Sequence, residues 1–231
     1  MLKQTLAIGS IPAILWGPAS DNVYIFMHGK LSRKEDAEGF SQIAGSKGCQ
    51  VISFDLPGHG ARQAEDDKCT VQNAVHDLRI ISDYITSRWS NVSLFASSLG
   101  AYFSLVAYRE LKFKKCLFQS PILDMENLIQ NMMKWSNVTK DDLREKQEIP
   151  TPMGETLSWP YYAYVRENPI VKWDNPTHIL IGSDDNLTPG KTVTAFVANF
   201  RCNLDVLENG EHFFHSKEQL EVLDKWLKLN I

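Results

Sequence analysis

The sequence predicts an α/β protein with an eight-stranded, mostly parallel sheet and helices on both faces of that sheet. Short apolar runs rich in β-branched and aromatic residues alternate with amphipathic segments, which is the pattern of helices covering a buried parallel sheet. The chain has 231 residues, 43% of them hydrophobic, so it is long enough to bury one sizeable core. We expect one domain over residues 1–231, with a cap insertion at about 122–172.

Eight segments have the composition of strands. The first two are separated by Gly9 and Ser10 and are expected to form a hairpin, whereas the other six alternate with helical segments. In chain order, the expected strands are 4–8, 12–16, 23–27, 50–54, 92–96, 115–119, 178–181 and 203–207.

Several helices are predicted from their first residues as well as from their apolar faces. A Ser or Thr oxygen accepts a hydrogen bond from an unpaired backbone N–H at a helix start, and Ser32–Glu35 and Ser216–Gln219 both fit this capping box. Thr188 and Pro189 predict a cap followed by proline at the first helical position. Two apolar helical faces are formed by Val71, Val75, Leu78, Ile81 and Ile85 and by Leu220, Leu223 and Leu227.

The alternation stops between Gln119 and His178. More than fifty residues there contain no run with the quality of a core strand, and Pro150, Pro152 and Pro160 predict short helices and loops. Because Met and aromatic side chains adapt to irregular ligands, we expect this insertion to form an apolar lid over a pocket. Its large apolar side chains are Met125, Met132, Met133, Trp135, Trp159, Tyr161, Tyr162 and Tyr164.

Ser98 is the candidate nucleophile. An apolar strand is followed by a turn of small residues and then by a helical pattern, so this serine is expected on a tight strand-to-helix turn. The strand and the helix cross closely there and leave room only for small residues two positions before and two after the serine. For Ser98 these residues are Ala96 and Gly100, whereas the corresponding neighbours of Ser97 are large.

The loop after the third strand is a candidate for the oxyanion hole. Open α/β sheets place their ligands at the carboxyl ends of strands, and this loop begins at such an end. Gly29 allows a sharp turn, so the backbone N–H groups of Lys30 and Leu99 are expected to point into the same crevice. Two such donors would stabilise a developing oxyanion.

Two other loops at strand ends carry a possible acid and base. Asp184 and Asp185 follow the seventh strand, and either carboxylate can orient a histidine. The loop after the last strand contains His212 and His215, and a histidine there can reach back over the sheet to Ser98.

These motifs resemble those of the α/β-hydrolase superfamily over nearly the whole chain. The likeness is greatest to small members with a short cap, either esterases and monoglyceride-lipase-like proteins or serine-aminopeptidase-like ones. The order Ser98, Asp185, His212 is the superfamily's order of nucleophile, acid and base. The superfamily pattern G-x-x-D-x-x-x-P selects Asp185 over Asp184, and its G-x-H-F pattern selects His212 over His215.

Two further motifs extend the resemblance, and two positions depart from it. The H-G-x oxyanion motif is met at residues 28–30, and the D-x-P-G-H-G loop is met at 55–60. Ala96 replaces the usual first glycine of the serine turn, and Lys30 stands where a small or apolar residue is more common. Some relatives carry the acid after the preceding strand, and Asp124 keeps that alternative open.

The resemblance implies a serine hydrolase of the carboxylesterase type. It would cleave a carboxylic ester with a small to medium apolar acyl or aryl group through an acyl-enzyme, using water and neither metal nor cofactor. A thioesterase, an amidase or an aminopeptidase would use the same triad, and a non-catalytic ligand-binding module on the same scaffold is a further alternative. The residues expected to contact substrate are His28, Gly29, Met132, Trp135, Trp159 and Phe213.

The composition argues against other classes of protein. The net charge of −4 does not favour a nucleic-acid partner, and no apolar stretch approaches the roughly 18 residues of a membrane span. Tyr24 and Gln63 stand where phosphate-binding and dinucleotide-binding patterns need glycine. No secretory leader is recognisable and no C-x-x-C pair is present, which predicts a cytoplasmic protein with reduced thiols. These thiols are Cys49, Cys69, Cys116 and Cys202.

Overall fold

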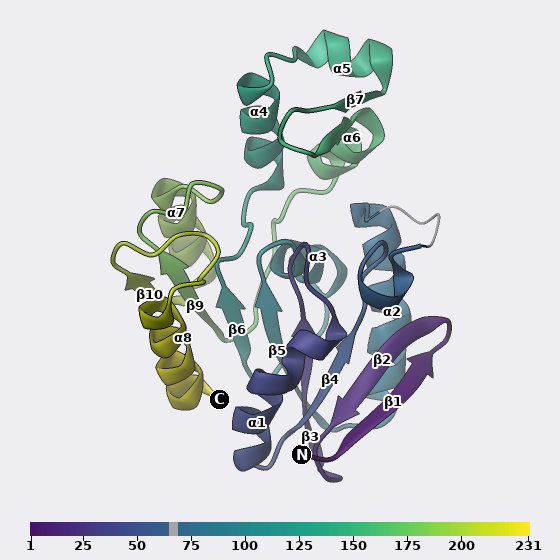
Figure 1. Ribbon diagram of the computed structural model, residues 1–231, viewed down its shortest axis with the longest axis vertical. Coiled ribbons are helices and arrows are strands. Elements are labelled where there is room, and N and C mark those ends of the chain that lie inside the picture. Colours follow the sequence, from purple (N-terminus) through teal and green to yellow (C-terminus); the bar gives the residue numbers. More distant parts are fainter. Residues whose placement is uncertain (65–68) are drawn as a thin grey trace.

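The computed structural model contains an eight-stranded sheet, and it describes residues 1–64 and 69–231 (Figure 1). The strand order is β1-β2-β4-β3-β5-β6-β9-β10, with β2 antiparallel to both of its neighbours and all other pairs parallel. The expected strands are confirmed, each to within one residue at either end. Their bounds are β1 Lys3–Ile8, β2 Ile11–Trp16, β3 Asn22–Met27, β4 Gln50–Phe54, β5 Asn91–Ser97, β6 Cys116–Gln119, β9 Thr177–Gly182 and β10 Asn203–Leu207.

Strand side chains divide the core into two apolar layers, because successive side chains point to opposite faces of a sheet. In β3, Val23, Ile25 and Met27 enter one layer, whereas Tyr24 and Phe26 enter the other. Figure 1 shows helices on both faces of the sheet and others above it. The first layer is covered by α2 (Val71–Thr86), α3 (Leu99–Ala107) and α7 (Gly190–Phe200), and the second by α1 (Glu38–Ser46) and α8 (Lys217–Asn230).

The capping box predicted for α8 is confirmed. The Ser216 Oγ accepts a hydrogen bond from the Gln219 N–H at 3.2 Å, and the Gln219 Oε1 accepts one from the Ser216 N–H at 3.3 Å. The predicted apolar face of this helix is only partly correct, because Leu220 is 47% exposed and the buried residues are Trp226 and Leu227.

Two other helix starts differ from the prediction. The residues Ser32 and Arg33 precede the short 3₁₀ helix η1 (Lys34–Ala37). Within η1, Asp36 and not Glu35 accepts hydrogen bonds from the Ser32 hydroxyl at 2.5 Å and from the Arg33 N–H at 3.0 Å. Thr188 does not cap α7, since its hydroxyl donates to the Pro121 carbonyl at 2.9 Å. Helix α7 begins at Gly190, directly after Pro189.

An insertion between β6 and β9 lies above the carboxyl ends of the parallel strands (Figure 1). It contains α4 (Met125–Trp135), α5 (Lys140–Lys146) and α6 (Trp159–Glu167), as the sequence predicts in outline. It also contains a hairpin of β7 (Glu148–Pro150) and β8 (Thr156–Ser158), which was not expected. Strands of three residues, one of them ending in proline, have too little periodicity to be recognised.

No helix in the described part of the chain has both the length and the hydropathy needed to cross a membrane. The four cysteines form no disulfide: Cys116 and Cys202 are buried in the core, and Cys49 and Cys69 are half-buried.

Candidate active site

Ser98 lies on the turn between β5 and α3 with φ 49° and ψ −117°. A non-glycine residue adopts this conformation only at a cost of roughly 1–3 kcal/mol, so the surrounding structure must hold it in place. A Cβ atom at Gly100, in the first turn of α3, would lie 2.4 Å from the carbonyl oxygen of His28, which explains why only glycine fits at this position. Ala96 is fully buried and fits where a larger side chain would not.

A chain of two hydrogen bonds joins three loops at this edge of the sheet. The Ser98 Oγ lies 2.8 Å from the Nε2 atom of His212, and the Nδ1 atom of His212 lies 2.7 Å from the Oδ2 atom of Asp185. A carboxylate can only accept, so the Nδ1 atom of the ring carries the hydrogen and the Nε2 atom of the neutral ring is free to accept from the serine.

The carboxylate of Asp185 is itself fixed by backbone donors. Its Oδ1 atom accepts from the N–H groups of Leu187 at 2.9 Å and Thr188 at 3.0 Å, and the residue is buried. The loop that carries His212 packs closely against the end of β9, just before Asp185. A Cβ atom at Gly182 would lie 2.1 Å from the Gly210 carbonyl oxygen, so only glycine allows this approach. The loops that carry Asp185 and His212 therefore touch through their backbones.

The alternative acids and base lie elsewhere. The Asp184 carboxylate accepts from the Ser183 hydroxyl at the surface, and Asp124 caps α4 by accepting from the Asn127 N–H at 3.0 Å. His215 is exposed, and its Nδ1 atom lies 3.0 Å from the Phe213 carbonyl oxygen. None of these side chains takes part in the hydrogen-bonded chain to Ser98.

His28 orients the loop that contains the candidate oxyanion donor. The Leu56 N–H donates to its Nε2 atom at 3.1 Å, so the protonated nitrogen is Nδ1, which donates to the Gly29 carbonyl oxygen at 2.7 Å. A trans peptide holds its C=O and N–H on opposite sides, so the N–H of Lys30 points away from the imidazole ring. The other candidate donor, Leu99, is the first residue of α3, where the N–H has no partner within the helix.

The loop of residues 55–60 holds His28 in place through a hydrogen bond. Asp55 is fully buried and accepts from the Lys34 N–H at 2.9 Å, the Lys34 Nζ at 2.7 Å and the Ala61 N–H at 2.9 Å. The next residue, Leu56, is the donor to His28. This motif thus fixes the position of His28 and of the loop after β3.

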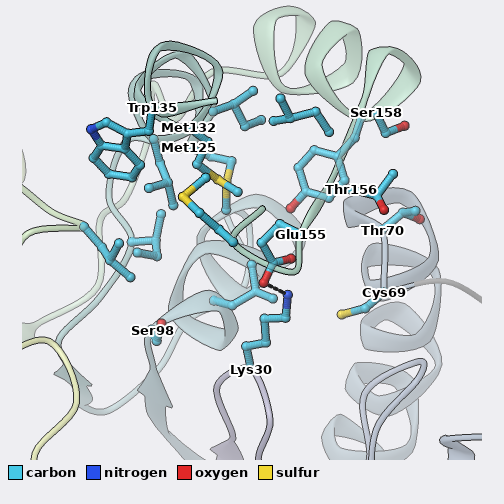
Figure 2. A pocket seen from close by; sticks show the side chains of 18 of the residues that line it. Lys30, Cys69, Thr70, Ser98, Met125, Met132, Trp135, Glu155, Thr156 and Ser158 are labelled. Atoms are coloured by element: carbon cyan, nitrogen blue, oxygen red, sulfur yellow. Dashed lines mark ion pairs between the residues drawn. The ribbon is translucent and has the colours of Figure 1, made fainter. Parts of the chain in front are cut away.

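A cavity of about 560 Å³ lies between the sheet and the insertion, with Ser98 and Leu99 in its wall (Figure 2). One side of the cavity is apolar and is formed mainly by α4, which contributes Met125, Leu128, Ile129, Met132 and Trp135. The opposite side is polar and includes Thr70, Thr156 and Ser158. The hydroxyl of Ser98 therefore faces a space that can hold a molecule with an apolar part.

Comparisons with solved structures give the fold. Est1E from Butyrivibrio proteoclasticus with ferulic acid bound aligns over 98% of this chain and 96% of its own, with a TM-score of 0.77 and 17% identity. Alpha/beta hydrolase domain-containing protein 10 from mouse aligns over 98% of this chain and 97% of its own, with a TM-score of 0.75 and 19% identity. The monoacylglycerol lipase of Paleococcus ferrophilus aligns over 96% of this chain and 99% of its own, with a TM-score of 0.68 and 17% identity.

The chain has the α/β-hydrolase fold. Among curated proteins, "Putative esterase/lipase 2" of Mycoplasma genitalium is 22% identical over 209 residues, which are 77% of this chain and 76% of that protein. No family model matches the sequence.

Four of the six residues expected to contact substrate lie outside the wall of the cavity, whereas Met132 and Trp135 line it. His28 is buried with both ring nitrogens hydrogen-bonded, and Gly29 packs against the serine turn. Trp159 packs against Tyr162 and Arg144, and Phe213 is 75% exposed. Composition identified these side chains, but it does not give the direction in which they point.

Sequence analysis missed several residues of the cavity wall. Met125, expected in the lid but not as a substrate contact, and Leu128 and Ile129 stand seven, four and three residues before Met132, so their helical spacing could have identified them. Cys69, which was expected only as a reduced thiol, also lines the cavity. No group of three or more His, Cys, Asp or Glu side chains within residues 1–64 and 69–231 is placed to hold a metal ion.

The buried imidazole of His28 makes stability depend on pH. Burial lowers its pKa to about 4 from its ordinary 6.5, so between these values the unfolded chain binds a proton that the folded chain excludes. The contribution of the neutral His28 ring to the free energy of unfolding is complete above pH 6.5 and is lost as the pH falls to 4. We expect urea unfolding to show that the wild type loses about 3 kcal/mol more than His28→Asn between pH 7 and pH 4.

The control for this experiment is His215→Asn, which changes an exposed histidine. Its pH profile of unfolding should follow that of the wild type. An identical pH dependence in the wild type and His28→Asn would contradict the assignment of this titration to the buried ring.

Proposed function

We propose that this protein is a serine hydrolase that cleaves carboxylic esters through an acyl-enzyme on Ser98. The observation that carries the proposal is the hydrogen-bonded chain from Ser98 through His212 to Asp185, with distances of 2.8 Å and 2.7 Å, in the wall of an open cavity. The esterases and lipases among its relatives support ester hydrolysis.

The proposed reaction has two halves. In the first, the Ser98 Oγ attacks the carbonyl carbon of the ester while the Nε2 atom of His212 takes the hydroxyl proton and Asp185 holds the Nδ1–H group. The backbone N–H groups of Lys30 and Leu99 stabilise the oxyanion. The same proton passes to the leaving alcohol as the ester bond breaks.

Water completes the reaction in the second half. His212 takes a proton from the water molecule as its oxygen attacks the acyl carbon, and a second oxyanion occupies the same site. The acid is released when the bond to Ser98 breaks, and the proton returns from the ring to the serine oxygen. The chain's own residues supply every proton transfer.

The size and lining of the cavity favour a substrate ester with an apolar acyl or aryl group of small to medium size. Its volume of about 560 Å³ lies within the usual range of roughly 300–1,000 Å³ for ligand pockets. The side chains of α4 give one wall an apolar surface. Est1E, which shares the fold, was solved with ferulic acid, an aromatic carboxylic acid.

A panel of p-nitrophenyl esters from acetate to dodecanoate, beside an aminoacyl anilide, tests the reaction class. We expect ester turnover with an optimum at short to medium chains and no cleavage of the anilide. A fluorophosphonate should add one adduct, which mass spectrometry would locate on Ser98. Faster cleavage of the anilide than of any ester would contradict the proposal.

The two adjacent serines provide matched variants for this panel. Ser98→Ala should abolish both turnover and labelling, whereas Ser97→Ala should retain them. A label on Ser97, or none on either residue, would refute the assignment of the nucleophile.

The adjacent aspartates test the acid in the same way. Asp185→Asn should lower kcat by roughly 10⁴-fold, because an amide at this position favours the wrong tautomer of His212. Asp184→Asn should change kcat far less, since its carboxylate faces solvent. Steady-state kinetics on the best ester would decide, and the reverse order of the two effects would move the acid by one position.

A further inference from the structure

An ion pair crosses the cavity between the sheet and the insertion. The Lys30 Nζ pairs with the Glu155 Oε1, and Figure 2 shows the two side chains meeting in the middle of the cavity. Lys30 lies in the loop after β3, and its backbone N–H is a candidate oxyanion donor. Glu155 lies in the turn between β7 and β8. The sequence marked Lys30 as unusual, but nothing in it pointed to Glu155 as its partner.

The turn that carries Glu155 is held together by its own backbone. The Thr151 N–H donates to the Glu155 carbonyl oxygen at 2.8 Å, and the Gly154 N–H donates to the Thr151 carbonyl oxygen at 3.1 Å. The flanking strands β7 and β8 pair antiparallel. The tip of this hairpin is therefore one unit, and Glu155 connects it to the oxyanion loop.

The ion pair is too exposed to contribute much to the stability of the fold. The side chains of Lys30 and Glu155 are 43% and 37% exposed, and ion pairs of this kind are weak and screened by salt. A weak contact suits a device that opens and closes during turnover. It biases the position of the hairpin without deciding whether the chain folds.

The pair also lies between the two sides of the cavity. Met125, Met132 and Trp135 are on one side of it, and Thr70 and Thr156 are on the other (Figure 2). The cavity is continuous past the ion pair, and the two side chains narrow the passage between its polar side and the side where α4 packs. Breaking the pair would widen this passage.

We propose that the Lys30–Glu155 pair is a latch that determines which esters reach Ser98. Closed, it admits compact esters and excludes those with a long polar extension; open, it lets such an extension occupy the side lined by Thr70 and Thr156. Glu155 is thus a specificity-determining and positioning residue that acts through Lys30. The inference rests on the proposed function, since it assumes that Ser98 is the reacting group.

Two fluorophosphonates test the latch without a known substrate. One carries an ethyl group and the other a long oligo(ethylene glycol) chain, and the measured quantity is the ratio of their labelling rates at Ser98, long over short. We expect Glu155→Gln to raise this ratio about two- to five-fold, the factor that corresponds to a weak ion pair. Raising NaCl from 20 mM to 500 mM should raise the ratio of the wild type similarly and leave that of Glu155→Gln unchanged.

A charge exchange and a surface control separate the ionic effect from a structural one. The double variant Lys30→Glu, Glu155→Lys should return the ratio and its salt dependence to the wild-type values. The ratio divides out any general loss of serine reactivity, and the salt arm needs no variant at all. Glu145→Gln, on the exposed surface of α5, should leave the ratio as it is.

The outcomes distinguish the latch from the proposed function. Labelling of Ser98 with a ratio that neither Glu155→Gln nor salt changes, or that Glu155→Gln lowers, would overturn the latch alone. No labelling of Ser98 by either probe would overturn the proposed function, and the latch with it.

Discussion

Backbone contacts that leave no space for a Cβ atom hold the site together. At Gly100 the start of α3 lies against the carbonyl oxygen of His28, and at Gly182 the end of β9 lies against the carbonyl oxygen of Gly210. The first contact brings the loop after β3 to Ser98, and the second aligns the loops that carry Asp185 and His212. The edge of a parallel sheet brings these loops near each other, and these contacts hold them at close range.

Buried polar groups then fix the loops in one orientation. The Asp55 carboxylate accepts three hydrogen bonds from Lys34 and Ala61, and this positions the Leu56 N–H that sets the tautomer of His28. The imidazole in turn sets the direction of the peptide between Gly29 and Lys30. A satisfied network of this kind rigidifies a site, whereas a partly satisfied one would be costly. The buried carboxylate of Asp55 thus helps to orient His28, although Asp55 does not line the cavity.

The sheet and the candidate nucleophile could be predicted from the sequence because both depend on local patterns. Strands such as β4 are short apolar runs, and Ser98 stands out because Ala96 and Gly100 are small. The wall of the cavity could be predicted only in part, since composition marks Trp159 and Phe213 as apolar but does not show that they face away. The ion pair of Glu155 joins residues 125 positions apart, and no local pattern connects them.

In the proposed reaction, Ser98 attacks an acyl carbonyl whose oxygen is held by the backbone N–H groups of Lys30 and Leu99. The most direct measurement is a crystal structure of the protein after reaction with diethyl p-nitrophenyl phosphate. We expect a phosphoryl group on Ser98 with one oxygen about 2.7–3.1 Å from the backbone nitrogens of both Lys30 and Leu99. A phosphoryl oxygen that contacts neither nitrogen, or an adduct on another residue, would contradict the proposed reaction.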